Sequence, residues 1–429
     1  MRFVSIFTLL FFLSASFAQV DPPISETMPK MKEGIPFSGI PGVRVRPYPY
    51  AYVNNQFKVY VLVEIMYDVL QFIFKNQEYQ AHFRNEIIFR EKKSKESYAK
   101  IWSSSFSVKD FESTNRRDKF FLSWDSLTIP PGKYQVTFSY QDLQGKQKFQ
   151  TTMNVNLPTV KNLFSPTPLF MVDDDMEGPR LSVFPARPLA SWGQLPFNKN
   201  IKMLLNVYAS HDSLFHISVT IHEKNKPTSL FQLDSLIHII DHQGNLVIDI
   251  PAYLWPEGHY DLKINYQSEK DNFVQTVPIE IIWMNKPRSL QMLESALLPL
   301  QIILSEDEYK RINSGNKEER RRKFEDFWQK KDPTPQTAFN EILVEFYSRV
   351  DSVNKQWGDR RTPGWKTDPG KIILLYGHPN QVEDRSLDPV KPFMRWTYAY
   401  DDRIITFTFD AIRGRKAYRL AEKQERLIQ

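Results

Sequence analysis

A pattern of strands and turns that occurs twice limits what this chain can fold into. Residues 130–134 (Pro-Pro-Gly-Lys-Tyr) match residues 256–260 (Pro-Glu-Gly-His-Tyr), and both copies continue to a Tyr-Gln pair, at 140–141 and 266–267. Pro and Gly reverse the chain, and the Tyr then starts a strand whose alternate residues point inward. Short strands separated by such turns predict antiparallel β-sandwiches.

The opening half of each copy is also apolar. The two first strands are expected at Asn54–Val63 and Asn198–Val207, the second strands at Leu70–Phe74 and Leu214–Val219, and the last strands at Phe149–Val155 and Val274–Ile282. The repeat predicts two tandem immunoglobulin-like or fibronectin-like domains, at 45–158 and 165–285, joined by a short Pro-containing linker. The alternative is one large β-domain whose internal similarity is accidental.

The first 18 residues have the features of a secretory signal peptide. Arg2 gives a positive start, residues 3–13 are apolar except for Ser5 and Thr8, and small residues precede a cleavage point after Ala18. The apolar run is shorter than the about 20 residues that a membrane span needs. We therefore expect an exported protein of the periplasm or outer membrane, without a transmembrane segment in the mature chain. Residues 19–44 are rich in Pro and Gly and predict an extended tail or linker.

The chain contains no Cys. This excludes the acylated Cys of a lipoprotein, disulfides, Cys-based metal sites and thiol nucleophiles. With 429 residues, cores of ordinary size can hold an exported chain together without disulfides. The net charge of +6 is modest, and export argues against nucleic acid as a partner. A basic surface that is only solvated, or one with a weak attraction to anionic glycans or lipid head groups, fits this charge.

The period of the apolar residues changes in the last part of the chain, residues 290–429. Ser305 with Glu308 has the form of a capping box, and Phe324, Phe327 and Trp328 have the spacing of one helix face, with a break near 314–315. Residues 332–335 (Asp-Pro-Thr-Pro) are expected to end this helix and to start the next, with Thr334 as its cap. The apolar face of that second helix consists of Phe339, Ile342, Leu343, Phe346, Tyr347 and Val350.

Strands are expected after these helices. A short strand is predicted at 371–376, two more at Met394–Tyr400 and Ile405–Phe409 around a turn at 401–402, and a fourth near Tyr418 and Leu420. The whole chain is therefore predicted to be multidomain, with two β-sandwiches followed by an α+β domain of two helices and a small antiparallel sheet.

A Gly-Trp-Lys-Thr-Asp sequence at 364–368 stands between the helices and the strands, and Tyr-Gly-His-Pro follows at 376–379. With Phe327-Trp328 and residues 330–335, these motifs resemble the bacterial GWxTD domain family over about residues 300–420. That family has no assigned biochemical activity and usually has Pro in place of His378. The last three strands also look like the small lipoprotein of the outer-membrane barrel-assembly machine, which suggests an interaction fold. The candidate site residues are Gly364, Trp365, Thr367, Asp368, Tyr376, Gly377 and Pro379.

The chemistry of the motif allows two interpretations. Thr367 and Asp368 can accept backbone N–H bonds and fix a turn while Trp365 fills a pocket beneath it, or the same loop can bind a peptide or glycan. No second acid, His or Ser is placed by the sequence to work with Asp368. We therefore predict no catalytic residues, no cofactor and no enzymatic activity.

Other polar clusters are weaker candidates. His238, Asp241 and His242 would need a helix to bind a metal, and the surrounding apolar residues predict a strand on which the two His lie about 13 Å apart. Residues 173–178 are acidic but lack the oxygen spacing of a Ca²⁺ loop. Residues 320–323 (Arg-Arg-Arg-Lys) are expected on the solvated face of a helix or in contact with an acidic surface. No metal site is predicted.

These observations predict a non-enzymatic exported scaffold or protein-interaction protein of the cell envelope. Its sandwiches would be spacers or adhesion modules, its C-terminal domain the recognition head, and its partners envelope proteins. The alternative is a glycan- or peptidoglycan-binding protein, because aromatic residues make up 14% of the chain and can stack on sugars.

Overall fold

The computed structural model describes residues 42–145, 147–161, 163–173, 181–269, 272–412 and 417–428. The predicted signal peptide and almost all of the Pro-rich tail lie outside these residues. The described chain forms two compact units. Unit 1 consists of the residues up to Gly193 with Lys202–Ile248 and Tyr260–Ile279, and unit 2 of Gln194–Ile201, Asp249–His259 and the chain from Glu280 onward. None of the described helices combines the length and the apolar character that a membrane span requires.

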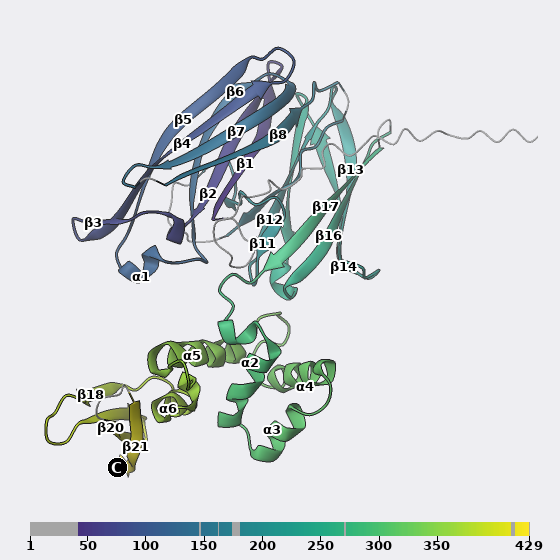
Figure 1. Ribbon diagram of the computed structural model, residues 1–429. Helices are drawn as coiled ribbons and strands as arrows, with labels where there is room; N and C mark the ends of the chain where they lie inside the picture. Colours follow the sequence, from purple (N-terminus) through teal and green to yellow (C-terminus); the bar gives the residue numbers. More distant parts are fainter. Residues whose placement is uncertain are drawn as a thin grey trace, which may run out of the picture. The chain divides into compact units, whose positions relative to one another are not determined.

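The first half of unit 1 consists of two antiparallel sheets packed face to face (Figure 1). One sheet has the strand order β1-β2-β6, and the other has the order β3-β4-β7-β8 with β5 also paired to β4. Alternate residues of β2 and β4, such as Val61 and Phe83, point into one shared core. The strands are β1 (Val43–Val53), β2 (Gln56–Met66), β3 (Ile73–Lys75), β4 (Glu78–Glu91), β5 (Ser97–Val108), β6 (Phe120–Ile129), β7 (Gly132–Asp142) and β8 (Lys148–Leu157), with the short helices η1 (Tyr67–Val69) and α1 (Phe111–Thr114).

A second pair of sheets repeats this strand order. Its sheets are β10-β9-β12-β15 and β11-β17-β16-β13-β14, so β12 and β15 occupy the places of β2 and β6, and β14-β13-β16-β17 the places of β5-β4-β7-β8. Strand β11 pairs parallel with the end of β17, and both segments belong to unit 2. The elements are β9 (Leu169–Val172), β10 (Arg187–Pro188), β11 (Gln194–Pro196), β12 (Ile201–Tyr208), β13 (Ser213–Glu223), β14 (Ser229–Ile239), β15 (Gln243–Ile250), η2 (Ala252–Leu254), β16 (Gly258–Gln267) and β17 (Asn272–Ile282).

The repeat in the sequence predicts the closing halves better than the opening halves. Gly132 and Gly258 begin the equivalent strands β7 and β16, and Tyr134 and Tyr260 are buried, as the turn pattern predicts. The predicted strand at Leu70–Phe74 is found only in part, as the short β3 at Ile73–Lys75, and the strand equivalent to β13 is β4. Leu70 instead follows η1 and packs into the core from an irregular segment.

The two sandwiches share an apolar contact within unit 1. Phe184 packs edge-on against Tyr50 and Tyr60, with ring centroids 5.3 and 5.6 Å apart. Around it the first sandwich contributes Tyr48, Leu62 and Leu122, and the second contributes Leu169, Met171, Leu181, Ala190 and Leu204. This cluster explains why β2 is buried on both faces, and it places the connection after residue 158 inside a compact unit.

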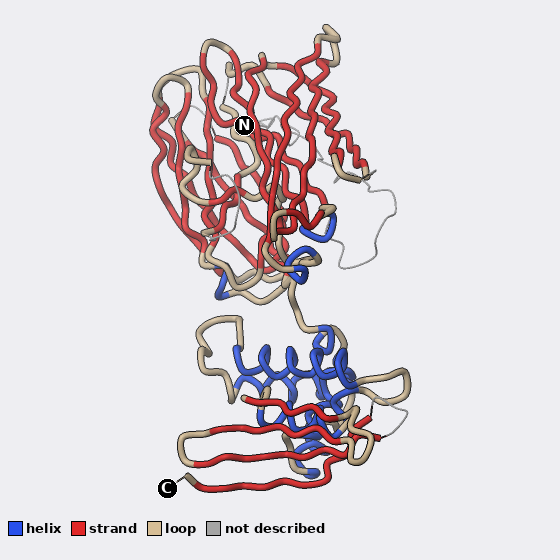
Figure 2. Tube along the Cα trace, turned by 90° about the vertical axis from the view of Figure 1, so that its left-hand side faces the viewer, coloured by secondary structure: helices blue, strands red, loops and turns tan. Residues whose placement is uncertain are grey.

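Unit 2 contains helices α2 to α6 and the last sheet of the chain. Figure 2 shows the helices on one side of the four-stranded sheet β18-β19-β20-β21, and apolar residues from both form one core. The elements are η3 (Arg288–Leu290), α2 (Leu293–Leu297), η4 (Leu298–Ile302), α3 (Glu306–Ile312), α4 (Lys317–Gln329), α5 (Glu341–Trp357), η5 (Gly364–Lys366), α6 (Asp368–Tyr376), β18 (Gln381–Arg385), β19 (Phe393–Ala399), β20 (Arg403–Ile412) and β21 (Ala417–Leu427).

Several predictions for the helices are confirmed. Ser305 forms a capping box with Glu308, and the chain breaks between α3 and α4 at Gly315, whose φ is +95°. Phe324 and Trp328 are buried in the core of unit 2. Thr334, however, does not cap the next helix. Asn340 does, because its side chain accepts the N–H of Leu343 at 2.9 Å.

The number of helices and the first strand of the sheet were predicted wrongly. The described residues of unit 2 form five α-helices rather than two, and residues 371–376 belong to α6 rather than to a strand. A short apolar run fits a buried strand and a buried helix equally well. The strand that completes the sheet is β18, whose sequence Gln-Val-Glu-Asp-Arg carries almost no apolar signal.

Candidate functional site

Gly364 lets the motif approach helix α5 more closely than any other residue could. A Cβ atom at this position would lie 1.9 Å from the carbonyl oxygen of Val353 and 2.7 Å from the Cα of Asn354. Gly370 has the same role one turn later, since its Cβ would lie 2.0 Å from the carbonyl oxygen of Gly364. Both glycines therefore permit the backbones of α5, η5 and α6 to touch.

Trp365 fills the core beneath this contact. Only 5% of its surface is exposed, and it belongs to the same apolar cluster as Val350 and Val353 of α5. Its backbone N–H donates to Asn354 Oδ1 at 3.4 Å, and Lys366 Nζ lies 5.2 Å from the centre of its ring. The indole is thus a packing group, with a cation over one face.

Thr367 is the N-cap of α6. Its hydroxyl donates to the carbonyl of Gly364 at 2.7 Å and accepts the N–H of Gly370 at 3.2 Å. The backbone carbonyl of Thr367 accepts the N–H of Lys371 at 2.9 Å. Thr at this position therefore both closes the η5 turn and starts the helix.

Asp368, the first residue of α6, connects the helix to the sheet. Its Oδ2 accepts the backbone N–H of Leu420 in β21 at 3.0 Å, and its Oδ1 lies 3.2 Å from Lys371 Nζ. A carboxylate is also favoured in the first turn of a helix, where the N–H groups carry positive charge. The acid of the motif is therefore used to fix β21 against α6.

The second half of the motif lies at the other end of α6. The ring of Tyr376 packs on Phe407 with centroids 5.0 Å apart, and its hydroxyl accepts a hydrogen bond from Lys423 Nζ at 3.3 Å. Gly377 ends the helix with φ +79°, and its carbonyl accepts the Tyr398 hydroxyl at 2.9 Å. Burial raises the pKa of this Tyr398 phenol above its ordinary value. Pro379 is half-buried and follows the exposed His378.

The seven candidate residues therefore lie at the two ends of one helix. Gly364 to Asp368 are at the start of α6, and Tyr376 to Pro379 are at its end, nine residues or about 13 Å further along the axis. The structure does not bring them together around one cavity.

A loop between β18 and β19 is exposed instead, and the sequence prediction missed it together with β18. Leu387 and Val390 are 95% and 87% exposed. Asp388 holds the loop, because its Oδ1 accepts the N–H groups of Val390 and Lys391 at 2.8 and 2.9 Å. The Lys391 and Val390 N–H groups lower the pKa of this carboxyl. A shallow pocket of about 310 Å³ is lined by Asp384, Arg385, Ser386, Leu387 and Asp388.

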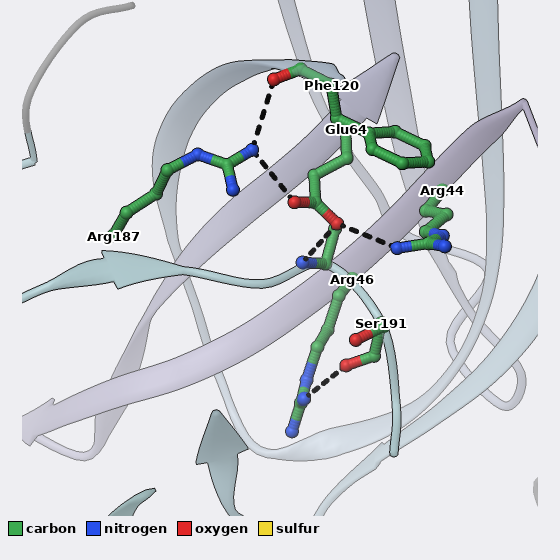
Figure 3. Close-up of polar contacts among 7 residues, drawn as sticks. Arg44, Arg46, Glu64, Phe120, Arg187 and Ser191 are labelled. Carbon is green, nitrogen blue, oxygen red and sulfur yellow. Dashed lines mark hydrogen bonds and ion pairs between the residues drawn. The ribbon is translucent and has the colours of Figure 1, made fainter. Parts of the chain in front are cut away.

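A buried ion cluster joins the two sandwiches of unit 1 (Figure 3). Glu64 of β2 is buried, and its carboxylate contacts Arg44 at 3.4 Å, Arg187 at 2.9 Å and the N–H of Ala190 at 3.2 Å. Burial lowers the pKa of Arg44, and the negative charge of Glu64 opposes that shift. Arg187 also donates to the carbonyl of Phe120 at 3.3 Å. One carboxylate therefore connects groups from both sandwiches.

Arg46 makes a second connection of the same kind. Its guanidinium is fully buried and donates to the carbonyls of Ser191, Thr167 and Pro168 at 2.9, 2.8 and 2.7 Å. The guanidinium carbon lies 4.8 Å from the centre of the Trp192 ring. Carbonyl dipoles and an aromatic face therefore contact this buried charge. The role of both clusters is structural.

The remaining sequence candidates lie in a strand and its turn, in a segment that is only partly described, and in a helix. His238 lies in strand β14, and Asp241 and His242 form the following turn with φ of +50° and +71°. Within the described residues, no group of three or more His, Cys, Asp or Glu side chains could hold a metal. Asp173 is described, whereas residues 174–178 of the acidic segment lie outside the described chain. Arg321 and Arg322 are exposed, and Arg320 pairs with Glu294 at 3.3 Å.

Comparison with known proteins identifies one family. Residues 265–426 match the model of the GWxTD domain, whereas a search of curated proteins found no match. The matched region includes the whole motif, helices α2 to α6 and the last sheet. This confirms the family that the motif indicates, and the chain contains a GWxTD domain at residues 265–426.

Proposed function

We propose that this protein is a non-enzymatic scaffold or protein-interaction protein of the bacterial cell envelope, with its C-terminal domain as the recognition head. The observation that carries this proposal is the loop of Leu387 and Val390. Two large apolar side chains that are almost fully exposed on a loop fixed by Asp388 are suited to insert into an apolar pocket of a partner protein.

The hydrogen bonds of the family motif support a function other than catalysis. Thr367 and Asp368 are the residues of the motif with side-chain oxygens, and both accept hydrogen bonds from backbone N–H groups. A general base has to be within reach of a substrate proton, and these oxygens already hold helix α6 and strand β21. The motif is therefore better suited to build the domain than to react.

The sandwiches supply a rigid support in this proposal. Glu64 and Arg46 bind groups of both sandwiches, and an apolar cluster fills the contact between them. A body built in this way resists bending at the connection between its halves, as a scaffold requires. The surfaces used for adhesion or spacing would then have fixed positions within unit 1.

Replacing Leu387 and Val390 by Ser is expected to prevent the protein from capturing its partner proteins. The experiment is a crosslinking pull-down from the native envelope with the full chain as bait. We expect at least a tenfold loss of captured protein, because interface anchors often contribute about 2 kcal/mol or more. The matched control replaces Leu427 and Ile428, also exposed apolar residues of unit 2, by Ser. Equal capture by both double variants and the parent would show that the loop is not the recognition surface.

Export is tested by the N-terminus of the protein in cells. We expect mass spectrometry of the envelope fraction to find a chain that begins at Gln19, because cleavage after Ala18 follows the small residues of the signal sequence. The control is the variant Ala18→Arg, which should retain the signal. A parent chain that still begins at Met1 and stays in the cytosol would refute both the export and the envelope role.

The glycan-binding alternative has less support. All nine Trp residues lie in the described chain, and each is buried or half-buried rather than exposed. Sugar platforms need an aromatic face that is open to solvent, and the strongly exposed rings of the described chain include Phe74 and Phe111 but no Trp. A protein-interaction role therefore remains the preferred proposal.

A further inference from the structure

Strand β14 is the open edge of the larger sheet in the second sandwich. In the described part of the chain, the sheet order ends at β14, which pairs with β13 on one side, and Figure 1 shows it at the margin of the sheet. The strand is 11 residues long. Its outer backbone groups can therefore accept another strand.

This edge has few of the features that usually prevent strand pairing, and the register irregularity between its Ser229 and Phe231 lies at the start of the strand. The sequence Ser-Leu-Phe-Gln-Leu-Asp-Ser-Leu-Ile-His-Ile of β14 contains one formally charged residue, Asp234, and no Pro, Gly or Lys. The edge strands of the C-terminal sheet are different, because β18 has three charged residues in five and β21 carries Arg, Glu and Lys along its length. Charged side chains and Pro are the common protection of sheet edges.

The exposed face of β14 is also apolar in part. Leu236 is 52% exposed, and Ile240, directly after the strand, is 63% exposed. Leu214 of the neighbouring strand β13 lies opposite His238 and is exposed as well. Large apolar side chains beside a free edge favour burial by another strand.

The sequence of β14 is complementary to itself in one antiparallel register. When two copies pair with Leu236 opposite Leu236 of the other copy, Asp234 of each copy faces His238 of the other. The imidazole can donate a hydrogen bond to the carboxylate. On the other face of the strand, Leu233 then opposes Ile239. The register therefore joins apolar residues to apolar residues and the single acid to a base.

We propose that β14 is a homodimer interface, in which a second copy of this chain pairs antiparallel along this edge. The two five-stranded sheets then form one continuous sheet across a two-fold axis at Leu236. The paired edges satisfy each other's backbone N–H and C=O groups and cover Leu236 and Ile240. This arrangement goes beyond the scaffold role, because it makes the scaffold bivalent.

Sedimentation equilibrium of the full chain tests the dimer. We expect the parent to have twice the mass of one chain at micromolar concentration. His238→Asp places two acids opposite each other at two symmetric positions, and we expect the dissociation constant to rise about tenfold or more. The double variant Asp234→Lys with His238→Asp restores opposite charges, and we expect it to recover the dimer.

The control is His216→Asp, which makes the same change on an exposed residue of the inner neighbour β13. It should leave the mass and the melting temperature of the dimer unchanged. A parent that is monomeric at all concentrations would overturn the proposal. An unchanged dissociation constant in His238→Asp would also overturn it, because the contact would then lie elsewhere. The same holds if the charge-reversed double variant does not recover the dimer.

Discussion

Replacing Glu64 by Gln will lower the free energy of unfolding of unit 1 by about 3–5 kcal/mol, the usual effect of removing one partner from a buried ion cluster. The variant keeps the shape of the side chain but removes its charge. Arg44 and Arg187, whose side chains are 10% and 12% exposed, then remain near each other without the carboxylate that contacts both. Chemical denaturation followed by circular dichroism measures the change.

The matched control for this experiment is Glu112→Gln, on an exposed residue of α1. It should change stability by less than about 0.5 kcal/mol, as surface substitutions usually do. Equal stability of Glu64→Gln and Glu112→Gln would mean that the buried cluster contributes nothing to the contact between the sandwiches.

Replacing Trp365 by Ala will destabilise unit 2 by about 3–5 kcal/mol, the range for large aromatic side chains removed from cores. The indole is 5% exposed and packs with residues of α5, so its removal leaves a cavity where η5 meets that helix. Asp368→Ala should cost about 1–3 kcal/mol, because the N–H of Leu420 loses its acceptor. Thermal melting of the full chain measures both effects.

The two interpretations of the motif give opposite results in this experiment. If the motif builds the domain, both variants melt earlier and lose a partner only as a consequence. Lys366→Ala is the control, since its side chain lies over the ring without filling the core, and it should melt within a few degrees of the parent. Normal melting of Trp365→Ala together with lost partner capture would show that the motif is a binding edge.

Local patterns in the sequence predicted the parts of the fold that depend on local physics. The Pro-x-Gly-x-Tyr turns place Tyr134 and Tyr260 inside equivalent strands because a reversal followed by alternation needs no distant residue. The capping box at Ser305 is local in the same way. The burial of Trp396 and Phe407 also follows from alternation alone.

The parts that the sequence could not predict depend on distant contacts. Ile372 to Leu375 form a helix because Thr367 caps it and Asp368 reaches a strand more than 50 residues later, as Leu420 shows. An apolar run by itself reveals neither the capping residue nor the distant contact. Glu64 looks like an ordinary exposed acid in a strand until the second sandwich covers it. The open edge at β14 likewise becomes visible only from the strand order.

The buried charges between the sandwiches have a consequence for the order in which the protein folds. Glu64 and its partner Arg187 are 123 residues apart in the chain, and Arg46 and its acceptor Ser191 are 145 apart. A chain that emerges from its N-terminus can close the first sandwich long before these partners arrive. During that interval the charged Glu64 and the aromatic Tyr60 are both exposed to water. In such a chain this surface stays uncovered until residues 167–191 have been made, and a chaperone that holds unfolded chains would bind it in that interval.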